Sequence, residues 1–390
     1  MLTRIKVSTF KSLVDFELKL GKFNCIIGLN GSGKSTVLQM ISYVSSLFKG
    51  DIQRWLDSRG WENKDVVSHF FPTRKTLEVA LDYSFDGKNY RWVGTYHLEK
   101  GVCTKELLVE LEDTSENRLL YRVSNGIYSS PAHRVELNFK YSGSVLATLN
   151  DDFLPHEAIR IRDYIAQIES HDLLSPKVMR SGQYSRQGRL GSSGEFLIHH
   201  IHSLDDAEKT VLTVKLAEYF KQVVKLDTKP LTDGTIELSL TERFYNDDGT
   251  HRDIITNAKH INDGMLRLLN ILANQRTEEI RFQLFDEIEN GVNPEVTEHL
   301  MDSFVNSPQQ TLVTTHSPMA LNYLEESVAV DSVILIYKPK NGMTKAKHLF
   351  EIPSAKAKLA ELAPGEVMVD LYLERVTEEA AEIVISESQS

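Results

Sequence analysis

The order of apolar and polar residues predicts two strands, a loop and a helix at the start of the chain. Residues 3–7 begin a strand, and residues 16–20 alternate apolar and polar positions with the period of a half-buried strand. Residues 23–27 are almost continuously apolar, as in a strand that is buried on both faces. A glycine-rich loop follows, and residues 35–48 then have helical periodicity.

The middle of the chain has the pattern of antiparallel β structure. Between residues 76 and 148, short alternating runs are separated by turns. Each of these turns has glycine after a polar residue, at Asp86-Gly87, Lys100-Gly101 and Asn125-Gly126. Residues 152–170 and 194–223 are predicted to be helical. Residues 235–244 and 250–256 are predicted to form a hairpin.

Helices and strands alternate from about residue 258 onward. The predicted helices are 264–275, 294–305 and a short one after Pro318, and the predicted strands are 281–286, 310–314 and 332–337. This alternation indicates a largely parallel sheet that is covered by helices. We expect 1–48 and 178–376 to form one unit, with 49–177 as a β-rich and helical insertion and 377–390 as a loose acidic tail.

Composition and charge restrict the class of protein. The 390 residues are 41% hydrophobic and 25% charged, which is ordinary for a globular chain. The net charge of −11 argues against indiscriminate nucleic-acid binding, although it leaves room for a local basic patch. The two cysteines, Cys25 and Cys103, lie in apolar stretches, which favours a reducing compartment. Without a run of about 18 apolar residues or a signal-peptide pattern, we expect a cytoplasmic protein and no membrane span.

The loop after the first buried strand carries a phosphate-binding pattern. Its sequence, Gly28-Leu29-Asn30-Gly31-Ser32-Gly33-Lys34-Ser35, satisfies G-x-x-x-x-G-K-[ST] between a strand and a helix. Glycines let backbone N–H groups turn toward phosphate oxygens, and the helix N-terminus adds partial positive charge. We expect Lys34 to reach the β- and γ-phosphates of ATP and Ser35 to hold Mg²⁺. The predicted binding residues are Asn30, Gly31, Ser32, Gly33, Lys34, Ser35 and Thr36.

Two acids, Asp286 and Glu287, lie at the end of the predicted strand 281–286. Asp286 lies at the strand end, where it can share with Ser35 the coordination of Mg²⁺. Glu287 comes one residue later and is suited to polarise the attacking water. An acidic cluster after a strand can also simply cap a helix, but the phosphate loop favours the catalytic interpretation.

A histidine follows the next predicted strand. His316 lies at the C-terminal end of that strand, and this is the edge of an open α/β sheet where ligands bind. We therefore predict that His316 contacts the γ-phosphate, although a single histidine is more often structural.

These motifs together resemble the ABC-type ATPase heads of the recombination and SMC class, and in particular the OLD-like ATPases of bacterial anti-phage systems. The resemblance rests on Phe10-Lys11-Ser12-Leu13, on Phe285-Asp286-Glu287-Ile288-Glu289-Asn290-Gly291 and on Thr314-Thr315-His316-Ser317-Pro318. It implies an α/β P-loop ATPase head with a mixed sheet, a helical lobe and a β-rich insertion. The residues after 351 are too few for the Toprim nuclease domain of many relatives, so we expect a separate effector protein.

The resemblance also implies a signature turn, and the matching residues are Asn262, Asp263 and Gly264. Asparagine stands where the family usually has serine, and it can still cap a helix and donate to a phosphate oxygen. The alternative is an ordinary helix cap. The sequence does not place the glutamine loop of the family, and neither Gln53 nor Gln183 is assigned to it.

The mechanism that the resemblance implies is an ATP sandwich between two heads, in which each nucleotide contacts the phosphate loop of one copy and the signature turn of the other. Such a homodimer is expected to sense or restrain a partner nuclease or toxin in anti-phage defence. A DNA-repair head that binds DNA directly is the alternative, and Lys177, Arg180, Arg186 and Arg189 would form its basic stretch. That stretch can also be a solvated loop. A nucleotide-gated scaffold with slow turnover is a third class, and a transporter head is disfavoured.

Overall fold

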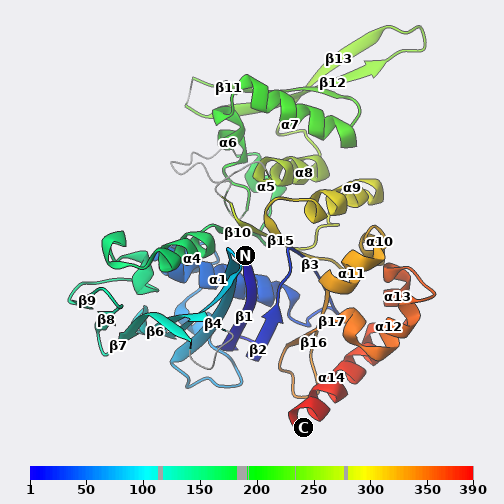
Figure 1. Ribbon diagram of the computed structural model, residues 1–390. Helices are drawn as coiled ribbons and strands as arrows, with labels where there is room; N and C mark the ends of the chain where they lie inside the picture. The colour runs from blue at the N-terminus through cyan, green and yellow to red at the C-terminus, as the bar shows by residue number, and fades with distance from the viewer. Residues whose placement is uncertain (113–116, 182–190, 192, 233, 276–279, 390) are drawn as a thin grey trace.

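The computed structural model describes residues 1–389 except 113–116, 182–190, 192, 233 and 276–279. In this part of the chain the strands form an eight-stranded, a six-stranded and a three-stranded sheet (Figure 1). The first helix, α1 (Lys34–Lys49), contributes side chains to a core that it shares with the eight-stranded sheet. Its first residues come directly from the glycine-rich loop, so the packing of α1 fixes the position of that loop.

The eight-stranded sheet is antiparallel and has the order β2-β1-β4-β5-β6-β7-β8-β9. Its strands are β1 (Leu2–Phe10), β2 (Leu13–Lys19), β4 (Thr76–Phe85), β5 (Lys88–His97), β6 (Val102–Leu111), β7 (Arg118–Ser124), β8 (Ile127–Ser129) and β9 (Arg134–Glu136). The antiparallel prediction for this region is confirmed. However, β1 pairs directly with β4, so the strands expected in a separate insertion continue the sheet that the N-terminus begins.

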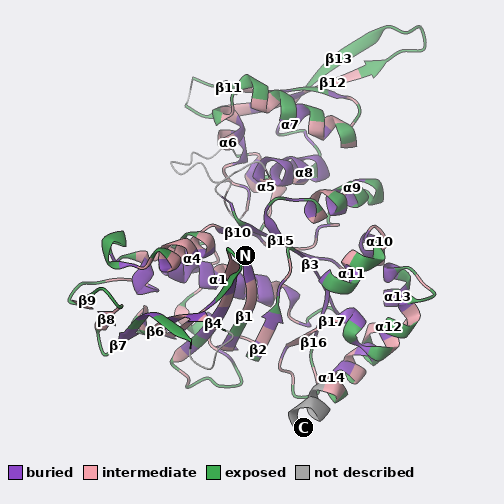
Figure 2. Cartoon of the chain, in the orientation of Figure 1, coloured by how far each residue is buried: buried purple, intermediate pink, exposed green. Residues whose placement is uncertain are grey.

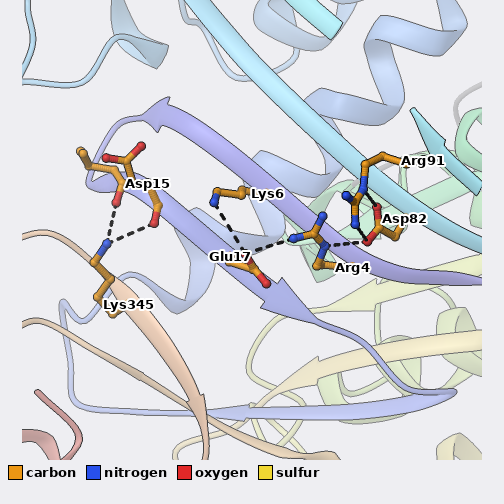
Figure 3. Close-up of polar contacts among 8 residues, drawn as sticks. Arg4, Lys6, Asp15, Glu17, Asp82, Arg91 and Lys345 are labelled. Atoms are coloured by element: carbon orange, nitrogen blue, oxygen red, sulfur yellow. Dashed lines mark hydrogen bonds and ion pairs between the residues drawn. The ribbon is translucent and has the colours of Figure 1, made fainter. Parts of the chain in front are cut away.

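One face of this sheet carries a row of ion pairs (Figure 3). The guanidinium of Arg4 lies 2.7 Å from Asp82 and 3.2 Å from Glu17, and Arg91 contacts Asp82 at 2.7 Å. At the end of the row, Lys345 Nζ donates to the backbone carbonyls of Val14 and Asp15. Because Lys345 belongs to the six-stranded sheet, this contact joins the edges of the two sheets.

The six-stranded sheet has the order β10-β14-β15-β3-β16-β17 and is parallel except for its last strand. Its strands are β3 (Phe23–Ile27), β10 (Ile168–His171), β14 (Phe282–Phe285), β15 (Gln310–Thr314), β16 (Val333–Tyr337) and β17 (Lys345–His348). The predicted alternation of strands and helices is confirmed, and so is the mixed sheet. The prediction of a helix over 152–170 is partly wrong, because only α4 (His156–Ala166) is helical there and β10 follows it.

The remaining elements form a lobe above the six-stranded sheet and a helical layer at the C-terminus (Figure 1). The lobe contains α5 (Pro176–Met179), α6 (Leu197–Ser203), α7 (Asp206–Tyr219), β11 (Val223–Pro230), β12 (Ile236–Tyr245), β13 (His251–Asn257) and α8 (Asp263–Asn274). The hairpin of β12 and β13 projects from this lobe, and its end, residues 244–255, is exposed (Figure 2). The other helices are α2 (Ile52–Asp57), α3 (Asn63–Val66), α9 (Pro294–Val305), α10 (Pro318–Asn322), α11 (Glu326–Ser332), α12 (Pro353–Leu359), α13 (Pro364–Asp370) and α14 (Leu373–Gln389), with 3₁₀ turns at Val145–Ala147, Asp151–Phe153 and Leu349–Glu351.

The expectation of a loose tail from residue 377 is wrong, because these residues continue α14. Ala380 on this helix is fully buried, and its carbonyl accepts a hydrogen bond from the Tyr337 hydroxyl at 3.3 Å. Between its acidic residues the tail has an apolar helix face. This face packs on a second hydrophobic core, separate from the one that α1 shares with the eight-stranded sheet.

Among the described residues, no helix combines the length and apolar character that crossing a bilayer would require. Both cysteine thiols are free and buried.

A buried carboxylate lies inside the eight-stranded sheet. Glu106 on β6 is 2% exposed and accepts hydrogen bonds from Ser144 Oγ at 2.6 Å, Val145 N at 2.7 Å and Tyr121 Oη at 3.0 Å. Burial raises the pKa of Glu106 from 4.5 to about 7, and these hydrogen bonds oppose the increase. The charged form of this carboxylate therefore destabilises the fold, even though several groups donate hydrogen bonds to it.

Replacing Glu106 by Gln tests this cost. The folded protein keeps the Glu106 proton to about pH 7, whereas the unfolded chain loses it near pH 4.5, so wild-type stability decreases as pH rises through this window. The free energy of unfolding of wild type relative to E106Q is expected to fall by on the order of 3 kcal/mol between pH 5 and pH 8. Urea unfolding at several pH values measures it, and a constant difference would contradict the assignment.

Candidate active site

The phosphate loop connects β3 to α1 and depends on two glycines with left-handed backbone. Gly28 has φ +152°, and a methyl group there would lie 2.2 Å from the carbonyl oxygen of Ile336. Gly33 has φ +112°, and a methyl group there would lie 2.7 Å from Thr344 Oγ1. No side chain fits at either position, so the sequence pattern of the loop follows from its close packing against β16 and Thr344.

Lys34 is the first residue of α1, and its side chain lies back along the loop. Its Nζ atom donates to the carbonyls of Gly28 at 2.9 Å and Leu29 at 3.1 Å. Burial lowers the pKa of Lys34, while the carboxylates of Asp286, Glu287 and Glu289 raise it. The amine is therefore held inside the curve of the loop and faces a concentration of negative charge.

The other predicted residues of the loop lie around this amine. Asn30 and Gly31 are exposed at the tip, and Ser35 and Thr36 are half-buried in the first turn of α1. The hydroxyl of Ser32 is buried without a hydrogen-bond partner. Triphosphate oxygens fit this loop, because they would accept from the unpartnered hydroxyl and from the N–H groups at the start of the helix.

Asp286 directly follows β14 and approaches the start of α1. Thr314, at the end of the neighbouring β15, donates its hydroxyl to Asp286 Oδ1 at 2.5 Å. Burial raises the pKa of Asp286, hydrogen bonds with Thr314 and Ser35 lower it, and the nearby Glu287 and Asp172 raise it further. The structure therefore brings together Ser35 and Asp286, which are far apart in the sequence. A magnesium ion fits between these oxygen ligands and would offset the cost of the buried carboxylate.

Glu287 occupies a left-handed conformation with φ +49°, which is uncommon for a residue other than glycine. Its N–H donates to Thr314 Oγ1 at 2.8 Å, so a single hydroxyl orients both acids. The Oε1 atom of Glu287 lies 3.6 Å from His316 Nε2, and the His316 N–H donates to Glu289 Oε1 at 2.6 Å. The structure therefore places His316 beside the second acid, at the C-terminal ends of β14 and β15.

The predicted signature turn lies at the start of α8. Asn262 Oδ1 accepts from the N–H of Met265 at 2.7 Å, which is the hydrogen bond of a helix cap. A methyl group at Gly264 would lie 2.0 Å from the carbonyl oxygen of Gly291, so the turn rests on the loop that follows the two acids. Asn262 and Asp263 are exposed.

Arg180 stabilises the segment that leads into this turn. Its guanidinium donates to the carbonyls of Ala258 at 3.2 Å and Ile261 at 2.6 Å and pairs with Asp263 at 2.6 Å. The Nε and Nη2 donors of Arg180 are therefore engaged inside the protein, so the predicted basic stretch does not offer these donors to DNA. Lys177 is exposed on α5, whereas Arg186 and Arg189 lie outside the described residues.

Asp172 is a site residue that sequence reasoning missed. It follows β10, whose last residue, His171, is in register with Phe285, so Asp172 ends its strand beside Asp286. Its carboxylate is buried and is bound by both oxygens to Arg59 at 2.7 Å. A helix was predicted over this strand, so no sequence pattern placed Asp172 at the sheet edge. Of the two glutamines considered for the glutamine loop, Gln53 donates to Asp57 on α2 and Gln183 lies outside the described residues.

Thr314 and Thr344 were also not predicted as site residues. Thr344 Oγ1 donates to the carbonyl of Ser32 at 3.0 Å and so supports the phosphate loop from behind. In the sequence, Thr314 was only part of the motif Thr314-Thr315-His316-Ser317-Pro318. The register of β15 with β14 is what brings its hydroxyl to Asp286.

The glycine-rich loop, the acids beside it and the order of the parallel strands define an ABC-type P-loop ATPase head. The chain matches the model of the family "AAA domain, putative AbiEii toxin, Type IV TA system" over residues 23–322, and it belongs to that family.

The individual proteins that this chain resembles share only part of its sequence. The OLD nuclease of Thermus scotoductus is 33% identical over 84 residues, which cover 21% of this chain and only 14% of that protein. The energy-coupling factor transporter ATP-binding protein EcfA1 of Fusobacterium nucleatum is 25% identical over 213 residues, or 50% of this chain and 69% of that protein. A solved SMC head bound to the C-winged helix domain of ScpA has a TM-score of 0.49 at 16% identity, covering 89% of this chain and 96% of that one.

Replacing Thr314 by Val tests the arrangement of the two acids. The isosteric change removes the hydroxyl that binds Asp286 and Glu287, so we expect a weaker Mg²⁺ site and ATP turnover at least ten-fold lower, equivalent to about 1.4 kcal/mol. Turnover as a function of Mg²⁺ concentration measures the effect. Thr311→Val is the matched control, because Thr311 is buried on the same strand and its hydroxyl has no hydrogen-bond partner. Equal effects of the two changes would contradict the role of Thr314.

Proposed function

We propose that this protein binds ATP with Mg²⁺ and hydrolyses it between two copies of the chain. The observation that supports this proposal most directly is the approach of Asp286 to Ser35 at the N-terminus of α1. Phosphoryl transfer requires mainly a positioned metal ion and an oriented nucleophile, and this arrangement supplies residues for both.

Each residue of the site has a distinct role in the proposed reaction. Ser35 and Asp286 would hold the magnesium ion, which would neutralise charge on the phosphates when bound. Lys34 exchanges its bonds to the loop carbonyls for bonds to phosphate oxygens. Glu287 accepts a hydrogen bond from the attacking water and polarises it, while His316 contacts the γ-phosphate from the same side. Glu287 and His316 already lie 3.6 Å apart, so the water and the γ-phosphate that they are proposed to contact would be neighbours.

The exposed signature turn supports the proposed dimer. Within one chain, Gly264 packs on Gly291 and the side chains of Asn262 and Asp263 face solvent. The cap uses the carbonyl oxygen of the Asn262 amide, which leaves its NH₂ group as the donor to a phosphate. A second copy would place this donor on the nucleotide, so ATP would hold the two copies together and its hydrolysis would release them.

We further propose that this ATP-dependent dimer senses or regulates a separate effector, either a nuclease or a toxin, in anti-phage defence. The family description, which names a toxin, and the partial similarity to an OLD nuclease favour this role. A DNA-repair head that binds DNA directly is the second candidate. Exposed Lys177, together with Arg186 and Arg189 further along the sequence, favours that candidate.

Replacing Glu287 by Gln tests the catalytic proposal. The amide keeps the shape of the side chain but cannot polarise water, so ATP and Mg²⁺ should bind, turnover should fall at least a hundred-fold, and a dimer should accumulate. Phosphate release and light scattering after size exclusion measure these effects. The control is Glu295→Gln, at an exposed glutamate in the first turn of α9. Normal turnover in E287Q would exclude Glu287 as the residue that activates water.

Reversing the charges of Arg186 and Arg189 tests the DNA-binding alternative. Arg180 is left unchanged, because its loss would disturb the segment before the signature turn. If the DNA-repair role is right, duplex DNA binding should be salt-dependent in wild type and lost in R186E/R189E, with ATP turnover preserved. DNA binding that is absent from wild type, or unchanged in the variant, would contradict this alternative.

A further inference from the structure

The strand β13 forms an open edge of the three-stranded sheet in the lobe. The sheet has the order β11-β12-β13, and the hairpin of β12 and β13 projects from the lobe (Figure 1). In the part of the chain that the structure describes, no strand pairs with the outer side of β13, and residues 251–255 are all exposed. An edge of this kind can accept a further strand from another chain.

The hydrogen bonds of the hairpin show which backbone groups of β13 point outward. The Asn246 N–H donates to the Thr250 carbonyl at 2.8 Å, and the Ala258 N–H donates to the Leu238 carbonyl at 2.8 Å. Hydrogen-bonded pairs alternate with non-bonded pairs along an antiparallel ladder, so the even-numbered residues of β13 bind β12. The N–H and carbonyl groups of the odd-numbered residues in the range 251–255 therefore point to the open edge.

The opposite edge of the same sheet is protected, whereas β13 is not. The strand β11 contains Lys225, Lys229 and Pro230, and its pairing with β12 has a register shift. Lysines, proline and bulges are features with which edge strands avoid pairing with other chains. The strand β13 has a continuous register with β12 and contains neither lysine nor proline. Its consecutive Ile254 and Ile255 are 41% and 73% exposed, so each face of the hairpin carries an apolar side chain beside the edge.

The charges on one face of the hairpin complement those of a second copy. Among the described residues, Arg252 has no acidic partner within ion-pair distance. Glu242 on β12 accepts a hydrogen bond from Thr256 at 2.7 Å, so its carboxylate lies beside Thr256. When two β13 strands pair antiparallel with Ile254 at the two-fold axis, Arg252 of each copy lies opposite Thr256 of the other and can reach Glu242 beside it. A register centred on Asp253 would instead bring two carboxylates together.

We propose that β13 pairs antiparallel with β13 of a second copy of this chain, in the register that places the two Ile254 residues opposite each other. Asp253 of each copy exchanges backbone hydrogen bonds with Ile255 of the other, which uses the groups that point to the open edge. The pairing is self-complementary, as an interface with two-fold symmetry requires. Neither the phosphate loop nor the predicted signature turn takes part, so this association needs no nucleotide and is separate from the proposed ATP sandwich.

Sedimentation velocity of the full chain without nucleotide, in EDTA and over a range of protein concentrations, tests the proposal. Wild type should form dimers as its concentration rises. Ile255→Pro removes an N–H that β12 does not use, so the hairpin should persist while the dissociation constant of the dimer rises about ten-fold or more. Ile255→Thr is the matched control, because it keeps the N–H and a β-branched side chain, and it should still dimerise.

Reversing the charges tests the register. Arg252→Glu and Glu242→Arg each place like charges together across the interface, so each single change should weaken the dimer by about ten-fold. The double variant R252E/E242R restores opposite charges in exchanged positions and should recover dimerisation. Circular dichroism of every variant checks that the fold is kept.

A wild type that stays monomeric without nucleotide would overturn the inference and would leave the edge to a different protein. Dimers that persist undiminished in Ile255→Pro would also overturn it, and so would a double charge variant that dimerises no better than the single ones. Because nucleotide is absent from these measurements, their outcome is independent of whether ATP joins two heads.

Discussion

The hydroxyl of Thr314 connects the two acids on which the candidate site depends. It donates to Asp286 and accepts from the N–H of Glu287, and Thr314 itself is fully buried at the end of β15. The carboxylate of Asp286 is thereby held in a desolvated position beside Ser35. A carboxylate in such a position is costly unless a cation compensates its charge, which explains why the phosphate loop, its lysine and this acid converge.

Close packing of the six-stranded sheet makes this convergence possible. The carbonyl of Ile336 on β16 approaches Gly28 so closely that no side chain fits, and Thr344 fills the space behind Gly33. The eight-stranded sheet supports the same loop indirectly, because its strands share a core with α1. The described strands of this β-rich region therefore support the site by fixing the helix that carries Lys34.

The predicted signature turn, Asn262–Gly264, is held by a different set of contacts. Gly264 packs on Gly291, and Arg180 holds the preceding segment through two backbone carbonyls. This segment begins where β13 ends, so the projecting hairpin and the turn are parts of one continuous connection. The turn and the loop after Glu287 are packed so closely that a side chain larger than hydrogen does not fit at Gly264.

The sequence alone determined which residues are candidates for the site, namely the phosphate loop, the acids Asp286 and Glu287, and His316, and it also predicted the strands that carry them. These features are local, because a buried strand, a glycine-rich turn and a helix start have characteristic patterns within a few residues. Only the tertiary structure decided that β10 joins the core sheet, that Asp172 and Thr314 lie beside Asp286, that Thr344 supports Gly33, and that Arg180 is an internal ligand of the backbone. Each of these contacts joins residues distant in sequence, and it is strand register and close packing that bring them together, which no local pattern of apolar and polar residues records.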